Sequence, residues 1–568
     1  MSRIVSHSYQ TWAFREGSGQ GVSKEADHTA PVKGRFWMQP SSLPKWLRAL
    51  GTALVALAVA GLLAALPAQA QGGTLRIAAS TIRQLDPYKS AANDEVHVFS
   101  LIFDTLIIHS REDSRPVPHL AERWETPDPT TWIFHLRPGV YFQDGNPVFP
   151  EGQGREVTAD DVVYSIQRFQ EVSTAFTLGA IASVEALDRY TVQLKTAHPD
   201  PFLIVDPNRL ARVAIVPREA IEQLGEDGFA QHPIGSGPFK LRRFIPDEEV
   251  VLERNEDYWL TPHLERVEFV VIPDPTVQTI ALEVGEVDVL PFLLNIDTAH
   301  QLAQNPEIEL YQRGGSWAGL GFNLTKAPFD EWVVRDAIAK ALDIDAAFQA
   351  VVGEAFGERA YGQVGPWVGF GYDPSLADLW PHDPEGALAQ LRAAGFADTD
   401  GDGFLDRDGK PLRVDIKTPP GSQTRVLTIL ATQLRQLGIQ ASVVPVDMAV
   451  WAADLISGNS EVFYDFSFAG TTGLIALFHS QSIGMTNTHF YANPEVDGLL
   501  DEASRTLDDA ERDRLWKEAQ RRIMQDRPVI PLYFELAFSA VNRRVKDWVP
   551  PWGGLHLVSL ENNVWIEE

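Results

Sequence analysis

Four aspartates at short, regular spacing could hold a cation. Asp398, Asp400, Asp402 and Asp406 form the pattern D-x-D-x-D-G-x-x-D. This pattern matches the first nine positions of a calcium loop, in which carboxylates two residues apart converge on one hard cation. The twelfth position, which an EF-hand fills with Glu, is Gly409. The alternative is a polar turn whose aspartates cap their own backbone, and any calcium bound here would be structural.

Motifs for catalysis are missing from the sequence. Gly235-Ser236-Gly237 lacks the spacing of a nucleophile elbow, and no H-E-x-x-H pair, Walker loop or G-x-G-x-x-G fingerprint occurs after a strand. His479 and His489 are separated by ten residues and have no acidic motif around them. A carboxylate pair of the glycosidase type stays open. We therefore expect a protein that is not an enzyme and that requires no cofactor.

Several aromatic residues lie among Gly and Pro rather than in periodic elements. They are Trp317, Tyr361, Trp367, Phe370 and Tyr372. Glycine-rich loops with aromatic side chains either pack as rigid surface loops or line a pocket that holds part of a ligand. We expect at least two of these five residues to line a pocket.

The composition limits the classes of partner. The chain has 568 residues, no Cys, and 77 acidic against 48 basic side chains, which gives a net charge of −29. A strongly acidic protein is a poor partner for nucleic acid or anionic lipid, because both require a concentrated positive patch. Without Cys there is no disulfide framework or thiolate metal site. With roughly 100 to 200 residues per domain, the length allows about two to four domains.

The N-terminal region has the features of an export signal. Residues 49–66 carry no charge, follow Lys45 and Arg48, and precede Ala68 and Ala70. This order of a basic region, an apolar region and a small-residue site predicts a signal peptide cleaved after Ala70. An uncleaved membrane anchor is the alternative. Residues 1–70 are thus an extension with a signal, and Met38 is an alternative translation start.

The exported part alternates strand and helix patterns. Residues 72–79 predict a first strand, and Trp132, Phe134 and Leu136 share one face of a strand that a turn would join to residues 141–142 as a hairpin. Thr158 precedes an acid by three residues, which predicts a helix start. Residues 331–342 have helical apolar spacing. A mixed α/β chain with more than one lobe follows.

Together, these segments resemble the family 5 extracellular solute-binding proteins, which include the dipeptide- and oligopeptide-binding proteins of ABC importers. The segments that match lie in order along the chain, at residues 75–78, 85–87, 118–125, 132–140, 157–165, 233–239, 254–259, 323–324, 328–330, 334–338 and 393–396. No single segment is decisive, but the ordered set makes coincidence very unlikely.

The resemblance implies a two-lobed periplasmic-binding-protein fold of the type II, clamshell kind, with an extra inserted subdomain. Lobe I would comprise residues 71–105, 216–316 and 540–568, the insertion residues 106–215, and lobe II residues 317–539. The chain would cross between lobes near Trp317 and Ser539. A solute would bind between the lobes of a periplasmic monomer and pass to the ABC permease subunits.

The resemblance also points to a ligand site. Where peptide binders of this family carry an acid for the ligand's amino group, residues 468–474 contain Thr471 and Thr472 but no acid. We therefore predict ligand contacts from Trp317, Tyr361, Trp367, Thr471 and Thr472. Peptides, opines, oligosaccharides, nickel chelates and haem all stay open as ligands. The alternative from another class is a secreted, calcium-stabilised carbohydrate-active or adhesive protein.

Overall fold

The structure, a computed structural model, describes residues 72–567 except for residues 91, 111–114, 174–176, 294–295 and 551–552. The predicted signal peptide and its cleavage site lie outside the described residues. Within the described part of the chain, no helix is both long enough and apolar enough to cross a membrane.

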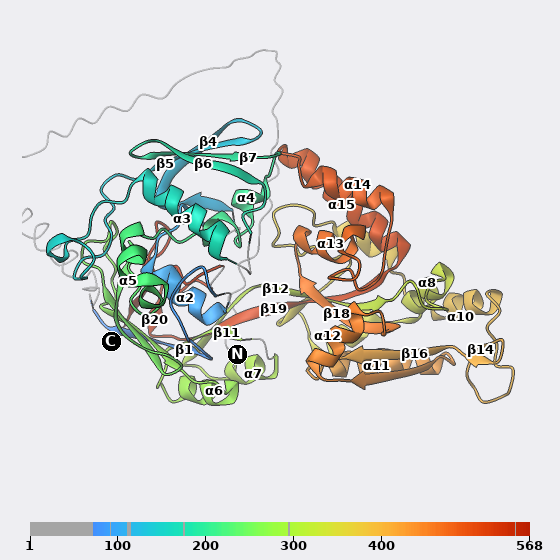
Figure 1. Cartoon of the computed structure of the whole chain (residues 1–568). Helices are drawn as coiled ribbons and strands as arrows, with labels where there is room; N and C mark the ends of the chain where they lie inside the picture. Colours follow the sequence, from blue (N-terminus) through green and yellow to red (C-terminus); the bar gives the residue numbers. More distant parts are fainter. Residues whose placement is uncertain are drawn as a thin grey trace, which may run out of the picture. The chain divides into compact units, whose positions relative to one another are not determined.

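A mixed sheet of eleven strands organises the described chain (Figure 1). Its order is β17-β16-β18-β12-β19-β11-β1-β10-β9-β8, and β13 pairs with β19 beside this path. The strands of this sheet are β1 (Thr74–Ala79), β8 (Phe239–Ile245), β9 (Glu249–Arg254), β10 (Arg266–Val271), β11 (Val289–Leu293), β12 (Ile308–Phe322), β13 (Gly357–Arg359), β16 (Arg413–Thr418), β17 (Gln440–Pro445), β18 (Val462–Phe468) and β19 (Val529–Asn542). The predicted first strand is confirmed as β1.

Two long strands, β12 and β19, belong to both halves of this sheet. One end of the β12–β19 pair adjoins β11, and the other end adjoins β18. We call the half with β11, β1, β10, β9 and β8 lobe I, and the half with β18, β16 and β17 lobe II. The residue boundaries predicted for the lobes stay predictions.

Lobe I carries helices and an insertion with its own sheet. Its helices are α2 (Asn93–Ile102), α5 (Arg218–Gln231), α6 (Pro275–Glu283) and α7 (Ile296–Leu302), and near its C-terminal end β20 (Val545–Lys546) pairs with β21 (Trp565–Ile566). The insertion contains a sheet of order β4-β5-β7-β6. The elements between α2 and α5 are β2 (Ile107–His109), β3 (Pro116–Pro118), β4 (Ala121–Asp128), β5 (Thr131–Leu136), η1 (Pro150–Gly152), α3 (Ala159–Val172), β6 (Ile181–Asp188), β7 (Thr191–Thr196), α4 (Phe202–Val205) and η2 (Leu210–Arg212).

In the insertion, the predicted helix start is confirmed, but the predicted strand pairing is not. Helix α3 begins where predicted, because the Asp161 carboxylate accepts the backbone N–H of Thr158 at 2.9 Å in a capping box. The predicted hairpin is wrong: β5 pairs with β4 and β7, and Tyr141 instead forms an isolated bridge with Glu156. The partner of each segment is therefore set by the tertiary fold rather than by the adjacent turn.

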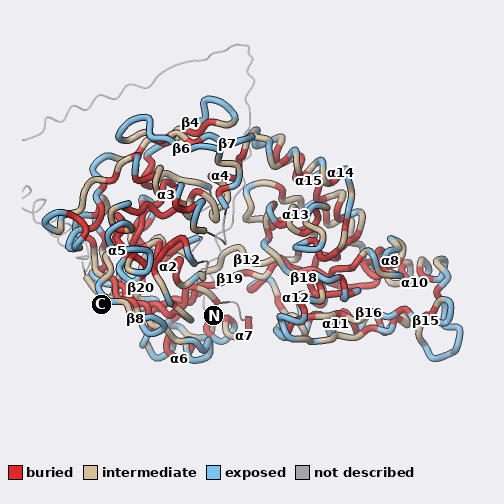
Figure 2. The backbone as a smooth tube through the Cα atoms, viewed as in Figure 1, coloured by how far each residue is buried: buried red, intermediate tan, exposed pale blue. Residues whose placement is uncertain are grey.

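Lobe II adds a set of helices to β18, β16 and β17. They are α8 (Trp332–Ala341), α9 (Ile344–Val351), η3 (Pro374–Leu379), α10 (Pro384–Ala393), α11 (Gln423–Gln436), α12 (Met448–Ile456), α13 (Thr471–Phe478), η4 (Ser480–Ser482), α14 (Pro494–Ala503) and α15 (Asp509–Asp526), with a hairpin of β14 (Asp406–Arg407) and β15 (Lys410–Pro411). Helix α8 confirms the predicted helix, with Val334 and Ile338 buried. Buried residues follow the strands and the inner helix faces of both lobes (Figure 2).

Candidate functional site

Two glycines stand where β12 crosses between the lobes. On the lobe I side Arg313 is opposite Ala537, and on the lobe II side Ser316 is opposite Glu535, with a register shift between these pairs. Gly314 and Gly315 occupy the shift. A Cβ atom at Gly315 would collide with the backbone of Glu535, closer than real Cβ contacts allow. Glycine is required here because the two strands approach so closely.

Trp367 lies at this crossing. Its indole ring occupies the space that a Cβ atom on Gly314 would need. The ring also makes an edge contact with Phe534 of β19, with centroids 5.4 Å apart and planes at 74°. Trp367 is half-buried. An indole in this position offers an apolar face beside both strands that join the lobes.

Hydrogen bonds join the two loops in which sequence analysis placed the site. The backbone N–H of Gly365 donates to the carbonyl of Ala469 at 2.9 Å, and the Gln363 amide donates to the carbonyl of Phe468 at 2.6 Å. Gln520 of α15, which is fully buried, holds the first loop in place: its oxygen accepts the N–H groups of Gln363 and Val364, and its amide donates to Gly371. The structure thus brings the loop of Tyr361 and Trp367 next to that of Thr471 and Thr472.

The other predicted site residues of these loops differ in exposure. Tyr361 is half-buried, with the Arg359 guanidinium 4.8 Å from its ring centroid. Thr471 is buried at the first turn of α13, where its methyl group lies against Gly371, whereas Thr472 is exposed. Ligand contacts by these residues stay predictions.

Trp317 has a packing position. Its side chain is 0% exposed in a hydrophobic cluster with Phe534, Trp516 and Leu474. In the structure it therefore stabilises lobe II, and the predicted contact between Trp317 and a ligand would require its neighbours to move.

Sequence analysis missed two carboxylates near the crossing. Glu535 is opposite Gly357 of β13, and the next residue, Glu358, is opposite Phe534. Burial raises the pKa of Glu535. Glu358 is exposed, but desolvation by neighbouring protein atoms raises its pKa as well. Neither carboxylate forms an ion pair or side-chain hydrogen bond with any described residue. A lone acid in the otherwise apolar run of β19 was the signal available in the sequence.

The insertion makes an aromatic contact with lobe II. Phe202 of α4 is 5% exposed, and its ring centroid lies 6.0 Å from Trp516 and 6.3 Å from Phe370. Phe370, one of the five aromatic residues noted in the sequence, thus packs at a contact between lobes rather than in a single lobe.

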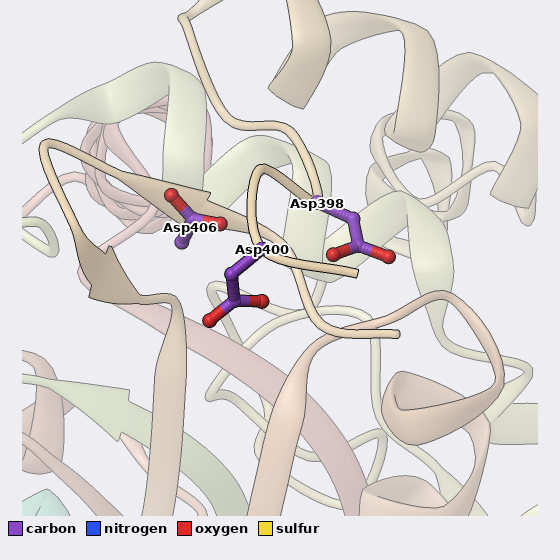
Figure 3. Close-up of side chains that lie close together, drawn as sticks. All are labelled: Asp398, Asp400 and Asp406. Atoms are coloured by element: carbon purple, nitrogen blue, oxygen red, sulfur yellow. The ribbon is translucent and has the colours of Figure 1, made fainter. Parts of the chain in front are cut away.

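The aspartate loop groups three of its four candidate ligands. Carboxylate oxygens of Asp398, Asp400 and Asp406 lie within 4.8 Å of one another (Figure 3). Asp402 is outside this group, and its carboxylate accepts the N–H of Phe404 at 2.8 Å. Hydrogen bonds from the hydroxyl and backbone of Thr399 lower the pKa of Asp406. The loop combines capped turns with three oxygen donors of the kind that calcium takes, so structural calcium stays a proposal.

Comparisons with known proteins now identify the class. The model of the bacterial extracellular solute-binding proteins, family 5, matches residues 115–474. The chain belongs to this family.

Individual relatives are similar to this chain along most of its length. "Heme-binding protein A" of Haemophilus influenzae is 27% identical over 482 residues, which cover 80% of this chain and 85% of the relative. "Glutathione-binding protein GsiB" of Salmonella typhi is 29% identical over 531 residues, covering 89% and 96%. The solved structure of HbpA2 from Haemophilus parasuis has a TM-score of 0.74 and 26% identity, and covers 87% of this chain and 100% of that one.

These comparisons confirm the predicted fold class, the two-lobed α/β fold of periplasmic binding proteins. Members of family 5 bind small solutes and work with ABC permeases. The alternative of a secreted carbohydrate-active or adhesive protein is not favoured, since the relatives are named as solute-binding proteins rather than enzymes.

Proposed function

We propose that this protein captures a peptide or peptide-like solute between lobe I and lobe II and delivers it to an ABC permease. Trp367 at the strand crossing is the observation that carries the proposal. It presents an aromatic face where both lobes meet, and its loop is fixed by Gln520. The name of the glutathione-binding relative supports a ligand of short-peptide size.

The arrangement of the two lobes suits the binding of a solute without any catalytic step. Closure is favoured by ligand only through contacts made from both lobes at once. Glu358 and Glu535 supply the negative charge that a buried ammonium group needs, in place of the acid that residues 468–474 lack. We propose further that the protein is a periplasmic monomer exported by cleavage after Ala70, and that no catalytic step is involved.

The test is calorimetric titration of the purified protein with glutathione, a set of dipeptides and haemin, preceded by mass spectrometry of any copurified solute. Binding of a peptide or of glutathione supports the proposal. Binding of haemin alone, with no peptide bound at millimolar concentration, contradicts the peptide assignment. N-terminal sequencing of periplasmic protein should give Gln71 as the first residue.

A further inference from the structure

One row of residues in lobe II combines an exposed aromatic ring with a carboxylate beside the crossing. Residues directly opposite each other in antiparallel strands point to the same face of the sheet. Phe468 of β18 is opposite Ser316 of β12, and Ser316 is opposite Glu535 of β19. Phe468 is 77% exposed, and Glu535 is half-buried. This row therefore presents a ring and an acid together on one face of the sheet.

A second row extends this face with more aromatic rings. It lies two residues away along each strand and so belongs to the same face: Phe466 of β18 is opposite Ala318, and Ala318 is opposite Tyr533 of β19. The Phe466 ring stacks on Trp451 of α12, with centroids 5.2 Å apart, and on Tyr464, with centroids 5.9 Å apart. Phe466 is nevertheless 39% exposed. We call the two rows the aromatic face, which comprises Ser316, Ala318, Phe466, Phe468, Tyr533 and Glu535.

The aromatic face lies at the edge of lobe II that is nearest the crossing. β16 and β18 run parallel and end at Thr418 and Phe468. In open α/β sheets, ligands bind outside the carboxyl ends of the parallel strands. Ser316 and Glu535 also form the pair next to the register shift at the crossing. A solute held between the lobes can therefore reach the aromatic face.

The carboxylate of this face lacks a counter-charge. No cationic side chain of the described residues forms an ion pair with Glu535, and burial raises the pKa of its carboxyl group. Burial also raises the pKa of Tyr533 and of Tyr464, with a smaller contribution from the charge of Glu535 in each, so both phenols stay neutral. Glu358 is opposite Phe534 and therefore points to the other face of the sheet. A carboxylate without a counter-charge among aromatic rings favours a positively charged ligand.

We propose that the aromatic face binds an ammonium group of the solute, with Glu535 as its counter-charge and the rings of Phe466 and Phe468 against the adjoining apolar chain. The inference rests on the proposed capture of a solute between the lobes, and it assigns the ammonium group to Glu535 rather than to Glu358. The carboxylate accepts a charge-assisted hydrogen bond, and the faces of aromatic rings attract a nearby cation. The protein would thus select solutes with a free amine over their N-acylated forms.

The experiment compares two pairs of ligands that differ in one positive charge. They are benzylamine, which is protonated at neutral pH, against benzyl alcohol, and leucyl-leucine against its N-acetyl derivative, each titrated by NMR and calorimetry at pH 7. We expect the cationic member of each pair to bind the wild type at least about tenfold more tightly, as for a hydrogen bond to a charged group. The methylene protons of bound benzylamine should also shift upfield, because they lie against the faces of aromatic rings.

Three variants test the carboxylate and the rings separately. Glu535→Gln should remove the preference for the cation, whereas Glu461→Gln, at an exposed acid just before β18, should keep it. Phe466→Leu keeps an apolar side chain but loses the ring, so it should weaken the binding of leucyl-leucine about two- to fivefold and reduce the upfield shift. Glu535→Gln should also raise the melting temperature at pH 7, because a partly buried charge without a partner is removed. A merely structural Glu535 would not lower the affinity while its removal raises stability.

The outcomes separate this inference from the proposed function. If leucyl-leucine binds the wild type and Glu535→Gln equally well, the capture of peptides stands and the ammonium site is overturned. If benzylamine binds through Glu535 but no peptide binds, the ammonium site stands and the peptide assignment fails. Equal binding of benzylamine and benzyl alcohol to the wild type overturns the inference. A preference lost in Glu358→Gln but kept in Glu535→Gln overturns it as well, because the amine would then lie on the other face. Melting curves establish that each variant is folded.

Discussion

The indole ring of Trp367 lies directly against the backbone of Gly314, at the point where β12 passes from lobe I to lobe II. Any side chain at position 314 would displace the ring. The position of Trp367, a predicted ligand contact, is thus coupled to β12, the strand that joins the lobes. Movement of β12 at Gly314 and binding of a ligand at Trp367 would therefore both act on this indole ring.

Replacing Trp367 with Ala should weaken solute binding by about 1–3 kcal/mol, because an aromatic anchor is lost. Thermal stability should change little, since the ring is only half-buried. The measurement is calorimetric titration with a copurified or screened ligand beside thermal melts. Trp332→Ala, at a Trp of α8 that is 48% exposed, is the matched control. Unchanged affinity together with a collapsed melting temperature would assign Trp367 to the core instead.

Replacing Phe202 with Ala should favour separation of the lobes. Each aromatic pair is worth about 0.5–1.5 kcal/mol beyond its buried area, and Phe202 makes two such pairs with lobe II. Small-angle scattering of the ligand-free protein should show a larger radius of gyration, and the melting temperature should fall because a buried aromatic side chain is lost. Tyr141→Ala, at an exposed aromatic residue, should leave the radius unchanged. A radius for Phe202→Ala equal to that of the wild type would rule out a role in holding the lobes together.

Glu535 should make stability depend on pH. Burial raises its folded pKa above the ordinary 4.5, so the folded state binds the proton more tightly than the unfolded state. Its favourable contribution is therefore complete below pH 4.5 and decreases as the pH rises through the folded pKa. Glu535→Gln should raise the melting temperature at pH 7 and leave it unchanged at pH 4. Equal shifts at both pH values would show that the charge is not the cause.

Calcium removal should lower stability if the aspartate loop holds the ion. Binding to the native state alone adds about 2.7 kcal/mol at a hundredfold excess of ion over its dissociation constant. A chelator should then lower the melting temperature of the wild type and of Asp227→Ala, an exposed control, but not that of Asp400→Ala. Identical melting curves of the wild type with and without chelator would show that the loop is a capped turn that is not stabilised by calcium.

Features determined by neighbouring residues could be predicted from the sequence. The start of α3 depends on Thr158 and Asp161, three residues apart, and its prediction is confirmed. The ligand site expected in the loops of Trp367 and Thr471 stays a prediction, and the hydrogen bonds through Gln363 that join these loops are visible only in the fold.

Features determined by long-range packing could not be predicted in this way. Trp317 is followed by small residues that suggest an open loop, yet β18 and β19 pair on both sides of it and bury it. The turn before Tyr141 favours a hairpin, whereas the residue that pairs with Tyr141 in the structure is Glu156, which lies beyond the range of a turn.

The register shift between β12 and β19 also has a mechanical consequence. Where Gly314 and Gly315 stand, the regular ladder between β12 and β19 is interrupted, so the backbone is held by fewer ladder hydrogen bonds there than in the paired segments on either side. A rotation of one lobe against the other can be absorbed there by the torsion angles of two glycines, and the ladder hydrogen bonds on either side keep their lengths. We therefore expect the crossing to act as a flexure, in which a few backbone bonds bend while the paired segments on both sides keep their shape.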